Sequence, residues 1–516
     1  MGISYKKDRT FIAAGLTVVM TAGVLAACTS TTNQGTPAGK NGTENKTEAN
    51  SGAPLEFSMM ATLWVADPPK IDGEPMKIIQ KATNTKLNIN WVPSGTYNEK
   101  VNATIATGQL PDVMTVTQGY DKTPGFINSV RSGMFWEVGP YLKDYKNLSK
   151  YNKNVLTNVS VDGKIYGLPR ALPLPRAKTF MYRKDWLDKL GLQKPKSLDD
   201  IYTVLKAFRD KDPDGNGKND TLPIVEGQGI DLFYVALAAY GGPDLWEVRN
   251  GQLVPDFMTD ENMQALKFMK KLYDEKLMNQ DFATLQGNQK NETFYKGTAA
   301  AYGGIVSESA NLKANTAKIP GADIDFVTRV SSTKGDRIFS NVGYDAMFVF
   351  PKSSVKTEEK LKKILDYFDK LADPEVLQLM SWGLEGVHFK MENGKPVTTD
   401  SAKFEIEINP LRALRATWDT IFRSNVEGLS EIRQKMTQSY LDNEPYVVSN
   451  PAYSLISETY VTKGAELDKM IKDARIKFIM GAIDENGWNS AVDQWKKTGG
   501  DKVIAELNAQ HAKLKP

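Results

Sequence analysis

The chain has 516 residues, and its 65 Lys and Arg nearly balance its 62 Asp and Glu, which leaves a formal net charge of +3. This balance, with no basic patch along the chain, excludes the charge pattern typical of nucleic-acid-binding proteins. A single cysteine excludes an internal disulfide, and two histidines argue against histidine-rich zinc sites and most Ser-His-Asp catalytic arrangements.

The N-terminus carries the pattern of a secreted protein. Residues 6–9 are basic overall, residues 11–24 are apolar, and Leu25-Ala26-Ala27-Cys28 follows. This order is typical of a signal peptide, and the apolar part is too short for a transmembrane helix. Leu-Ala-Ala-Cys resembles the lipobox of bacterial lipoproteins. The resemblance implies that residues 1–27 are removed and that Cys28 carries a diacylglycerol, with palmitate-type chains that anchor the protein in the membrane. The alternative is an ordinary cysteine beside a secretory cleavage site.

Residues 28–54 are expected to form a flexible tether. They are rich in Ser, Thr, Asn and Gly, and none is aromatic. Such a segment cannot bury enough apolar surface to offset the entropy lost when it becomes ordered. Its composition is similar to that of the stalks of Gram-positive lipoproteins. We therefore expect a protein held on the extracellular face of a Gram-positive cell membrane.

The body after the tether is long enough for two or more hydrophobic cores. Residues 87–92 alternate apolar and polar side chains, which predicts a strand, and residues 112–116 read as a buried strand. Between these strands, Val101 and Ile105 at helical spacing predict a helix over 97–107. This strand-helix-strand order is typical of a parallel sheet in a mixed α/β fold.

Four further helices and one strand are predicted along the rest of the body. Ser197 and Asp200 have the spacing of a helix capping box. Leu198, Ile201, Leu205 and Phe208 then mark the apolar face of that helix. The other predicted helices cover 358–371, 409–423 and 465–479, and a buried strand covers 346–350.

Five segments match the motifs of one family, in that family's order. They are 108–113 (GQLPDV), 163–170 (GKIYGLPR), 182–190 (YRKDWLDKL), 294–300 (FYKGTAA) and 382–389 (WGLEGVHF). Together they resemble the extracellular solute-binding proteins of ABC importers, in particular the large oligosaccharide-binding members of family 1. Each motif alone is weak, but the five cover nearly the whole body.

The resemblance implies an α/β, two-lobed periplasmic-binding-protein fold of the type II-like class, with a hinge between the lobes. Residues 55–172 and 341–405 would form the first lobe, and residues 173–340 and 406–516 the second. The chain would cross between lobes near Leu172 and Asn341. Such a hinge closes around a ligand, and the closed receptor is then presented to the ABC permease subunits. We expect the receptor to be a monomer.

A loop after the helix that begins at Ser197 has the spacing of a calcium site. Its oxygen donors alternate, and Gly217 stands at the sixth position, where an EF-hand needs a sharp bend. The predicted ligands are Asp212, Asp214, Asn216, the carbonyl of Lys218, and Asp220. The loop departs from an EF-hand at its twelfth position, which is Pro223, and Thr221 stands where related sugar-binding proteins carry a glutamate. We expect a structural calcium ion; the alternative is an ordinary polar turn.

Aromatic side chains at the ends of predicted elements are candidates for contact with a sugar. Flat rings pack on the apolar faces of pyranose rings, and polar groups fix the hydroxyls. The candidate ligand-binding residues are Trp64, Asp67, Arg170, Trp246, Tyr344, Asp345, Trp382 and Glu385. A packing role is the alternative for each of them. Trp136, Trp186 and Trp495 are expected to pack in cores, and His388 to be a hydrogen-bonded turn residue and not a catalyst.

These observations favour a membrane-anchored, non-enzymatic receptor that delivers a carbohydrate, expected to be an oligosaccharide, to an ABC importer. Two alternatives stay open. A lipid-anchored enzyme such as a glycoside hydrolase needs two carboxylates about 5 or 6.5–9.5 Å apart, and 62 acidic residues leave room for such a pair. The same fold also suits another solute, such as a peptide.

Overall fold

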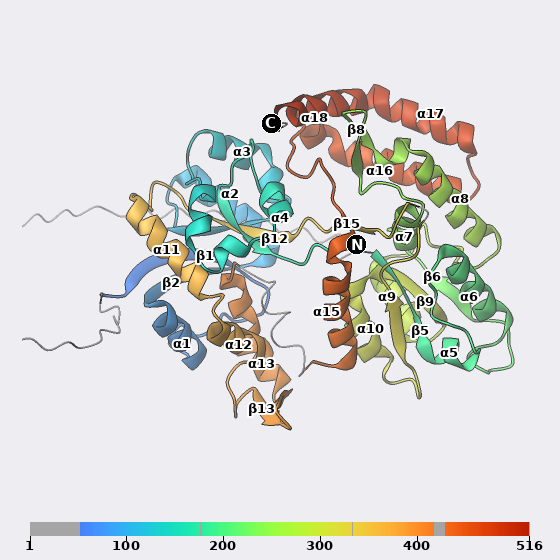
Figure 1. Cartoon of the computed structure of the whole chain (residues 1–516), viewed down its shortest axis with the longest axis horizontal. Coiled ribbons are helices and arrows are strands. Elements are labelled where there is room, and N and C mark those ends of the chain that lie inside the picture. Colours follow the sequence, from blue (N-terminus) through green and yellow to red (C-terminus); the bar gives the residue numbers. More distant parts are fainter. Residues whose placement is uncertain (1–51, 176–177, 333, 417–428, 515–516) are drawn as a thin grey trace, which may run out of the picture. The chain divides into compact units, whose positions relative to one another are not determined.

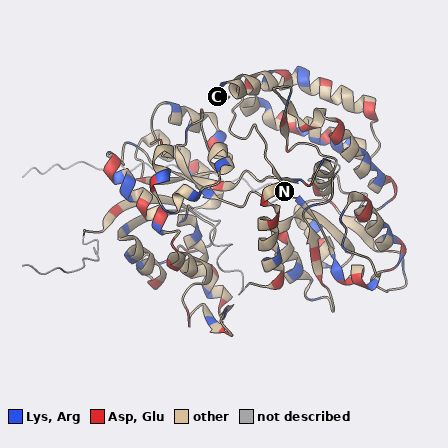
Figure 2. Cartoon of the chain, in the orientation of Figure 1, with Lys and Arg blue, Asp and Glu red and all other residues tan. Residues whose placement is uncertain are grey.

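The computed structural model in Figure 1 describes residues 52–175, 178–332, 334–416 and 429–514. Cys28, the predicted signal peptide 1–27 and the tether up to residue 51 lie outside the described residues. Within the described ranges, no helix combines the length and the apolar character that crossing a membrane requires. Figure 2 shows Lys and Arg interspersed with Asp and Glu along the helices, as the small net charge leads one to expect.

The first sheet has five strands in the order β2-β1-β3-β12-β4. Its strands are β1 (Leu55–Leu63), β2 (Thr85–Pro93), β3 (Val113–Thr117), β4 (Gly167–Ala171) and β12 (Tyr344–Val349). β1 runs parallel to β2 and β3, whereas β12 runs antiparallel to β3 and β4. The predicted strands at 87–92, 112–116 and 346–350, and the parallel unit formed by the first two, are confirmed.

Side-chain alternation along β1 divides this sheet into two buried faces. Phe57, Met59 and Ala61 point into one core, and Met60 points into another. Helices cover both faces, so β1 is apolar on both sides, as expected for a mostly parallel sheet. The first core receives α1 (Glu74–Thr83), α11 (Glu358–Lys370) and α12 (Pro374–Trp382), and the second receives α2 (Tyr97–Thr107) and α3 (Pro124–Arg131).

The second sheet has four strands in the order β10-β5-β9-β6. They are β5 (Lys178–Arg183), β6 (Leu222–Val225), β9 (Ala299–Ile305) and β10 (Ile324–Val327). One face packs against α6 (Leu198–Asp210), α7 (Asp231–Ala239), α8 (Asp260–Asp274) and α16 (Glu458–Ile479). The other face packs against α9 (Gly287–Tyr295), α10 (Ser309–Thr316) and α15 (Glu431–Asn443).

Helix α6 forms as the sequence predicts. The Ser197 hydroxyl accepts the Asp200 N–H, and the Asp200 carboxylate accepts the Ser197 N–H, so the capping box is complete. The side chains of Ile201, Leu205 and Phe208 are fully buried. Trp186 and Trp495, expected to pack, are also buried, and the Trp136 Nε1–H donates to the Val355 carbonyl.

Two predicted helices differ from the structure. Residues Asn409–Leu414 form a 3-10 helix, because Leu411 and Leu414, three residues apart, both pack on the first sheet. The rest of that predicted helix, from residue 417 to 423, lies outside the described residues. Helix α16 begins at Glu458 and not at residue 465, because the Ser457 hydroxyl accepts the Tyr460 N–H and caps it there.

The remaining elements are shorter connections, terminal helices and β-hairpins. The helices are α4 (Lys153–Asn158), α5 (Lys184–Lys189), α13 (Ser401–Glu407), α17 (Glu485–Trp495) and α18 (Asp501–Leu514). The strands are β7 (Trp246–Arg249), β8 (Gln252–Pro255), β11 (Ile338–Phe339), β13 (Phe389–Glu392), β14 (Lys395–Thr398) and β15 (Val447–Val448).

Two segments that join the first sheet to the second lie side by side. The Leu172 N–H donates to the Gly343 carbonyl at 2.7 Å, and the Asn341 N–H donates to the Leu174 carbonyl at 2.7 Å. The predicted crossing points, Leu172 and Asn341, therefore belong to one hydrogen-bonded pair of connections.

Candidate functional site

Three predicted ligand-binding residues meet at one edge of the first sheet. Trp64 follows the end of β1, Arg170 lies near the end of β4, and Asp345 lies near the start of β12. Because β12 runs antiparallel to β3 and β4, its first residues lie at the carboxyl ends of the other strands. In open α/β sheets, ligands bind outside the carboxyl ends of the strands.

The geometry at this edge combines an exposed ring with a charged pair. The Arg170 Nε–H donates to Asp345 Oδ1 at 2.6 Å, and the guanidinium carbon lies 5.8 Å from the centre of the Trp64 ring. Trp64 is 41 % exposed. The Arg170 Nη1 group is buried and has no hydrogen-bond partner among the described residues. The arrangement offers an aromatic face to a sugar and polar groups to its hydroxyls.

A β-bulge explains how Asp345 reaches this position. Tyr344 pairs with Ala171 and Ala346 pairs with Arg170, so Asp345 is the extra residue in the ladder. Its side chain is exposed, whereas the neighbouring Tyr344 is fully buried and donates its hydroxyl hydrogen to Asp121 Oδ2. Burial, followed by the charge of Asp121, raises the pKa of Tyr344 well above its usual value. The Tyr344 side chain is therefore fixed in the core next to the exposed Asp345. Its predicted contact with ligand stays a prediction.

Among the described residues, the other predicted ligand-binding side chains form no hydrogen bond, ion pair or ring contact with Trp64, Arg170 or Asp345. Asp67 is exposed in the loop after β1, and Trp246 opens β7 and packs partly against the core of the second sheet. Trp382 ends α12 and is buried near Phe389, with ring centres 6.4 Å apart, and Glu385 lies in the exposed turn that follows. Their contact with ligand stays a prediction.

His388 lies in the same turn and is fully buried. Its Nδ1 accepts the Leu384 N–H at 3.0 Å, and its Nε2 lies 3.2 Å from Glu407 Oε2. The prediction that His388 is a hydrogen-bonded turn residue is confirmed.

The predicted calcium loop has an ordered backbone that surrounds its acidic side chains. Asp212 accepts the N–H groups of Gly215, Asn216 and Gly217, and Gly217 adopts φ 78°, as the sixth position requires. The Asn216 amide donates to Asp214 Oδ2 at 2.8 Å and to Asp220 Oδ1 at 3.0 Å. The loop therefore gathers carboxylate oxygens around one side-chain amide.

A hard cation suits this donor set, since it is built of oxygens that carry excess negative charge. Hydrogen bonding to Asp214, and then to the Gly217 N–H, lowers the pKa of Asp212. Partial burial, and then the Asp212 bond, raises the pKa of Asp214. Among the described residues, however, no three His, Cys, Asp or Glu side chains converge as a metal-binding group. For a cation to bind, the Asn216 side chain would have to rotate, so that its amide oxygen and not its NH₂ group faces Asp214 and Asp220.

A second charged cluster, which the sequence did not reveal, lies at the corresponding edge of the second sheet. Glu226 follows β6, and its carboxylate accepts the N–H groups of Asp231 and Leu232 at the start of α7. The Asp231 carboxylate in turn accepts hydrogen bonds from the ammonium groups of Lys178 and Lys290. Burial raises the pKa of Glu226 to about 7, although Lys290 opposes the shift.

Gly303 in β9 makes room for this cluster. A Cβ at this position would lie 2.0 Å from Glu226 Oε1, so only glycine fits. The sequence signal for the cluster has two parts. One is the pair Gly303-Gly304 inside an apolar strand, and the other is Glu226, an acidic residue directly after a second apolar strand. Nothing in the sequence shows that these two segments adjoin.

Comparison with known proteins identifies the family. A model of the family described as "Bacterial extracellular solute-binding protein" matches residues 68–376, which is more than half of the chain. The chain is a bacterial extracellular solute-binding protein. The predicted family and the predicted function of a solute receptor are thereby confirmed.

Two relatives from Bacillus subtilis (strain 168) cover nearly the whole solute-binding protein. The polygalacturonan/rhamnogalacturonan-binding protein YtcQ is 38 % identical over 497 residues, which are 95 % of this chain and 96 % of YtcQ. Lipoprotein LipO is 38 % identical over 470 residues, 89 % of this chain and 92 % of LipO.

A solved structure of the substrate-binding protein FusA from Streptococcus pneumoniae, in complex with kestose, shares the fold. Its TM-score is 0.62 at 19 % identity, over 89 % of this chain and 99 % of FusA. The predicted α/β, two-lobed fold is confirmed.

Proposed function

We propose that this solute-binding protein is the non-enzymatic receptor of an ABC importer and that it captures an oligosaccharide. The observation that carries the proposal is the exposed Trp64 ring beside the Arg170–Asp345 pair at the carboxyl edge of the first sheet. The names of YtcQ and of FusA, a fructooligosaccharide ABC transporter substrate-binding protein, support the same class. Closure of the lobes around the sugar would present it to the permease subunits.

Within that class, we propose an acidic oligosaccharide made of galacturonate units. YtcQ, which is 38 % identical over almost its full length, is named for binding polygalacturonan and rhamnogalacturonan. Arg170 and Lys178 place cations at the carboxyl edges of the two sheets. Sugars of this kind carry one carboxylate per galacturonate, and guanidinium groups bind carboxylates well.

Isothermal titration calorimetry tests both levels of the proposal. Trigalacturonate should bind with micromolar or better affinity, kestose should bind more weakly, and the bound sugar should be recovered unchanged. Cleavage of trigalacturonate would favour the glycoside hydrolase and refute the receptor. Binding of neutral sugars alone would refute only the acidic class, and binding of peptides alone would refute the carbohydrate class.

Calcium at the 212–220 loop is a separate proposal. Asp212, Asp214, Asn216, the Lys218 carbonyl and Asp220 would hold the ion, which would supply a structural clamp and no chemistry. A FusA structure described as an EF-hand mutant supports a calcium loop in this family. Calcium should raise the melting temperature of chelated protein, and Asp212→Asn should abolish the rise. A calcium-independent melting temperature would refute the proposal.

We also propose that Cys28 carries the lipid anchor and that residues 28–54 link it to the body. LipO, named a lipoprotein, supports this. The anchor would raise the effective concentration of the receptor near its permease. Cys28→Ala should release the protein from the cell membrane, lower uptake and leave calorimetric affinity unchanged. Retention of the variant on cells would contradict the anchor.

The lobe boundaries are proposed as 55–172 with 341–416 for the first lobe, and 173–340 with the remainder for the second. The strands of the two sheets fall on either side of this division. The first lobe extends beyond residue 405 because Leu411, Leu414 and Ala416 pack on the first sheet. The receptor is proposed to be a monomer, which sedimentation velocity would test.

A further inference from the structure

Closure of a two-lobed receptor around its ligand requires that the ligand contacts both lobes. A ligand that touches one lobe alone binds the open and the closed forms equally well and cannot shift the equilibrium between them. Trp64, Arg170 and Asp345 all lie at the edge of the first sheet. The ligand therefore needs a second set of contacts at the second sheet.

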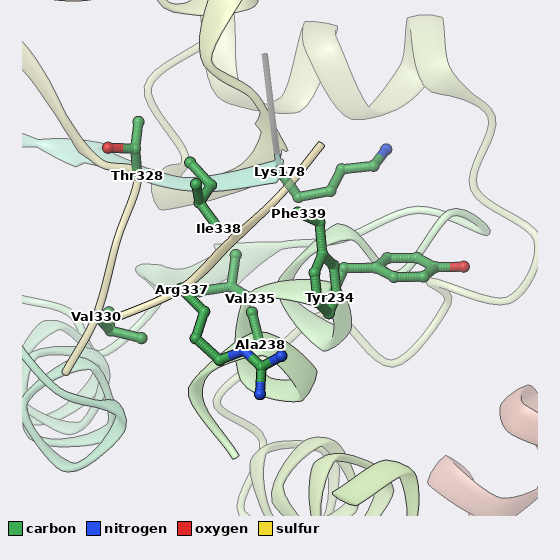
Figure 3. Close-up of a pocket in the computed structure, with 9 residues that line it drawn as sticks. All are labelled: Lys178, Tyr234, Val235, Ala238, Thr328, Val330, Arg337, Ile338 and Phe339. Carbon is green, nitrogen blue, oxygen red and sulfur yellow. The ribbon is translucent and has the colours of Figure 1, made fainter. Parts of the chain in front are cut away.

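The hollow that Figure 3 shows beside α7 is too small to supply these contacts. Lys178, Tyr234 and Arg337 are among its lining residues, and its volume is about 10 Å³. This volume is room for a water molecule and not for a sugar unit. An open surface, and not this hollow, is therefore the place for a sugar contact in the second lobe.

The carboxyl edge of the second sheet includes the end of β10. Both β10 and β9 run antiparallel to β5, and β6 runs parallel to β9, so β6, β9 and β10 end at one edge. Arg329 lies two residues after Val327, the last residue of β10. It therefore stands at the edge where open α/β sheets bind their ligands.

Arg329 links an exposed tyrosine ring to an aspartate at this edge. Its guanidinium carbon lies 3.8 Å from the centre of the Tyr446 ring, and its Nε lies 3.2 Å from Asp336 Oδ2. Tyr446 is 38 % exposed. Because the guanidinium covers one face of the ring, the open area of the ring is its other face and its rim.

Two hydrogen bonds fix the turn that carries Tyr446, which ends the 3-10 turn directly after α15. The Asn443 side-chain amide donates to Thr328 Oγ1 at 2.8 Å. The Asp442 carbonyl accepts the Arg329 Nη1 group at 3.3 Å. The end of α15 is thereby held against the segment after β10, so the tyrosine is placed at the edge before a ligand arrives, which lowers the entropic cost of binding.

The same combination of groups occurs at the edge of the first sheet. There the Arg170 guanidinium pairs with Asp345 and lies beside the ring of Trp64, which is 41 % exposed. Among the described residues, three aromatic side chains are exposed, and two of them, Trp64 and Tyr446, stand at a carboxyl edge beside an Arg–Asp pair. The third, Tyr460, lies in the first turn of α16.

We propose that Tyr446 is the sugar-stacking residue of the second lobe and that Arg329, oriented by Asp336, positions its ring. The inference rests on the oligosaccharide receptor proposed above and assigns the contact that its second lobe needs. A sugar ring lies against the open face of Tyr446, since aromatic faces suit the apolar faces of sugars. This stacking does not depend on a carboxylate, so it holds for acidic and neutral sugars alike.

Calorimetry on Tyr446→Ala, Tyr446→Phe and Tyr460→Ala tests the contact, with whichever of trigalacturonate and kestose the wild-type protein binds. Tyr446→Ala should weaken binding about tenfold, and Tyr446→Phe, which keeps the flat ring, should bind as the wild type does. Tyr460→Ala is the matched control. It removes an exposed tyrosine whose hydroxyl donates to Asp468, and it should leave the affinity unchanged.

Hydroxyl-radical footprinting of the wild-type protein separates contact with the sugar from a structural role of Tyr446. Tyr446 and Tyr460 are 38 % and 44 % exposed, so both should be oxidised in the free protein. The bound sugar should suppress the oxidation of Tyr446 and leave that of Tyr460 unchanged.

Four results would overturn the inference. Unchanged affinity of Tyr446→Ala would show that the sugar does not stack on this ring, and equal losses for Tyr446→Ala and Tyr446→Phe would show that the ring is not the contact. Weaker binding of Tyr446→Ala without protection of Tyr446 in the wild type would show that its role is structural. In these three cases the wild-type protein still binds the sugar, so the proposed receptor stands. If the wild type binds neither sugar, the oligosaccharide receptor and this inference both fail.

Discussion

Asp244 is a carboxyl buried beside one of the two segments that connect the sheets. It is 6 % exposed, and its Oδ2 accepts the Ser340 hydroxyl at 3.1 Å. Burial raises its pKa to about 7, with the Ser340 bond opposing and the charge of Asp256 adding to the shift. No cation of the described residues forms an ion pair with it. We therefore expect Asp244→Asn to change the pH dependence of stability.

The size and sign of the effect follow from linkage. The folded pKa of about 7 exceeds the ordinary value of 3.8 by about three units, which is worth about 4 kcal/mol. A raised carboxyl pKa contributes stability that is present below pH 3.8 and is lost as the pH rises through about 7. The isosteric amide does not titrate. The variant should therefore match the wild-type protein near pH 4 and be more stable by up to about 4 kcal/mol at pH 8.

Urea unfolding of both proteins between pH 4 and pH 8 measures the difference. Asp72→Asn, in the exposed turn before α1, controls for the removal of one carboxylate. The reasoning is refuted if the difference between Asp244→Asn and wild type is the same at both ends of this range, or if the variant is less stable at pH 8.

Three further substitutions test the site and the fold. Trp64→Ala should weaken trigalacturonate binding by about tenfold without lowering the melting temperature, because the ring is exposed but lies beside Arg170. Gly303→Ala should cost about 1–3 kcal/mol in urea unfolding, since its Cβ would collide with Glu226. Ser197→Ala should cost about 1 kcal/mol by the same assay, because it removes the cap of α6.

Each substitution has a matched control. Met480→Ala changes a residue as exposed as Trp64, at the end of α16, and should leave affinity intact. Gly287→Ala adds a Cβ that meets nothing within 4 Å, and Ser430→Ala alters an N-cap whose side chain makes no capping bond. Equal effects of a substitution and its control would contradict the reasoning behind that prediction.

Local sequence patterns predicted the helices and strands whose formation depends mainly on neighbouring residues. The alternation over 87–92 gave β2, and the Ser197–Asp200 spacing gave the start of α6. The predicted helix from residue 409 differed because packing on the first sheet favours a 3-10 turn there. The start of α16 was missed because the interior Gly464 obscured a helix that Ser457 caps about two turns earlier.

The candidate site was only partly predictable because its members are far apart in the chain. Trp64, Arg170 and Asp345 were among eight candidates, and only the structure shows that these three meet. Arg170 and Asp345 are separated by 175 residues, and the β-bulge that turns Asp345 outward depends on the pairing of β12 with β4. Such a bulge has no signature in the sequence of one strand alone.

The sequence by itself determined the family, the α/β class and the elements of the body, because strand alternation, helix caps and motif order are properties of neighbouring residues. The tertiary structure alone decided which charges are balanced. Lys178 and Arg337 look alike in the sequence, yet Asp231 forms an ion pair with the first, whereas the second donates a hydrogen bond to the Gly241 carbonyl and forms no ion pair with the described residues. Charge balance depends on distances between residues that only folding brings together.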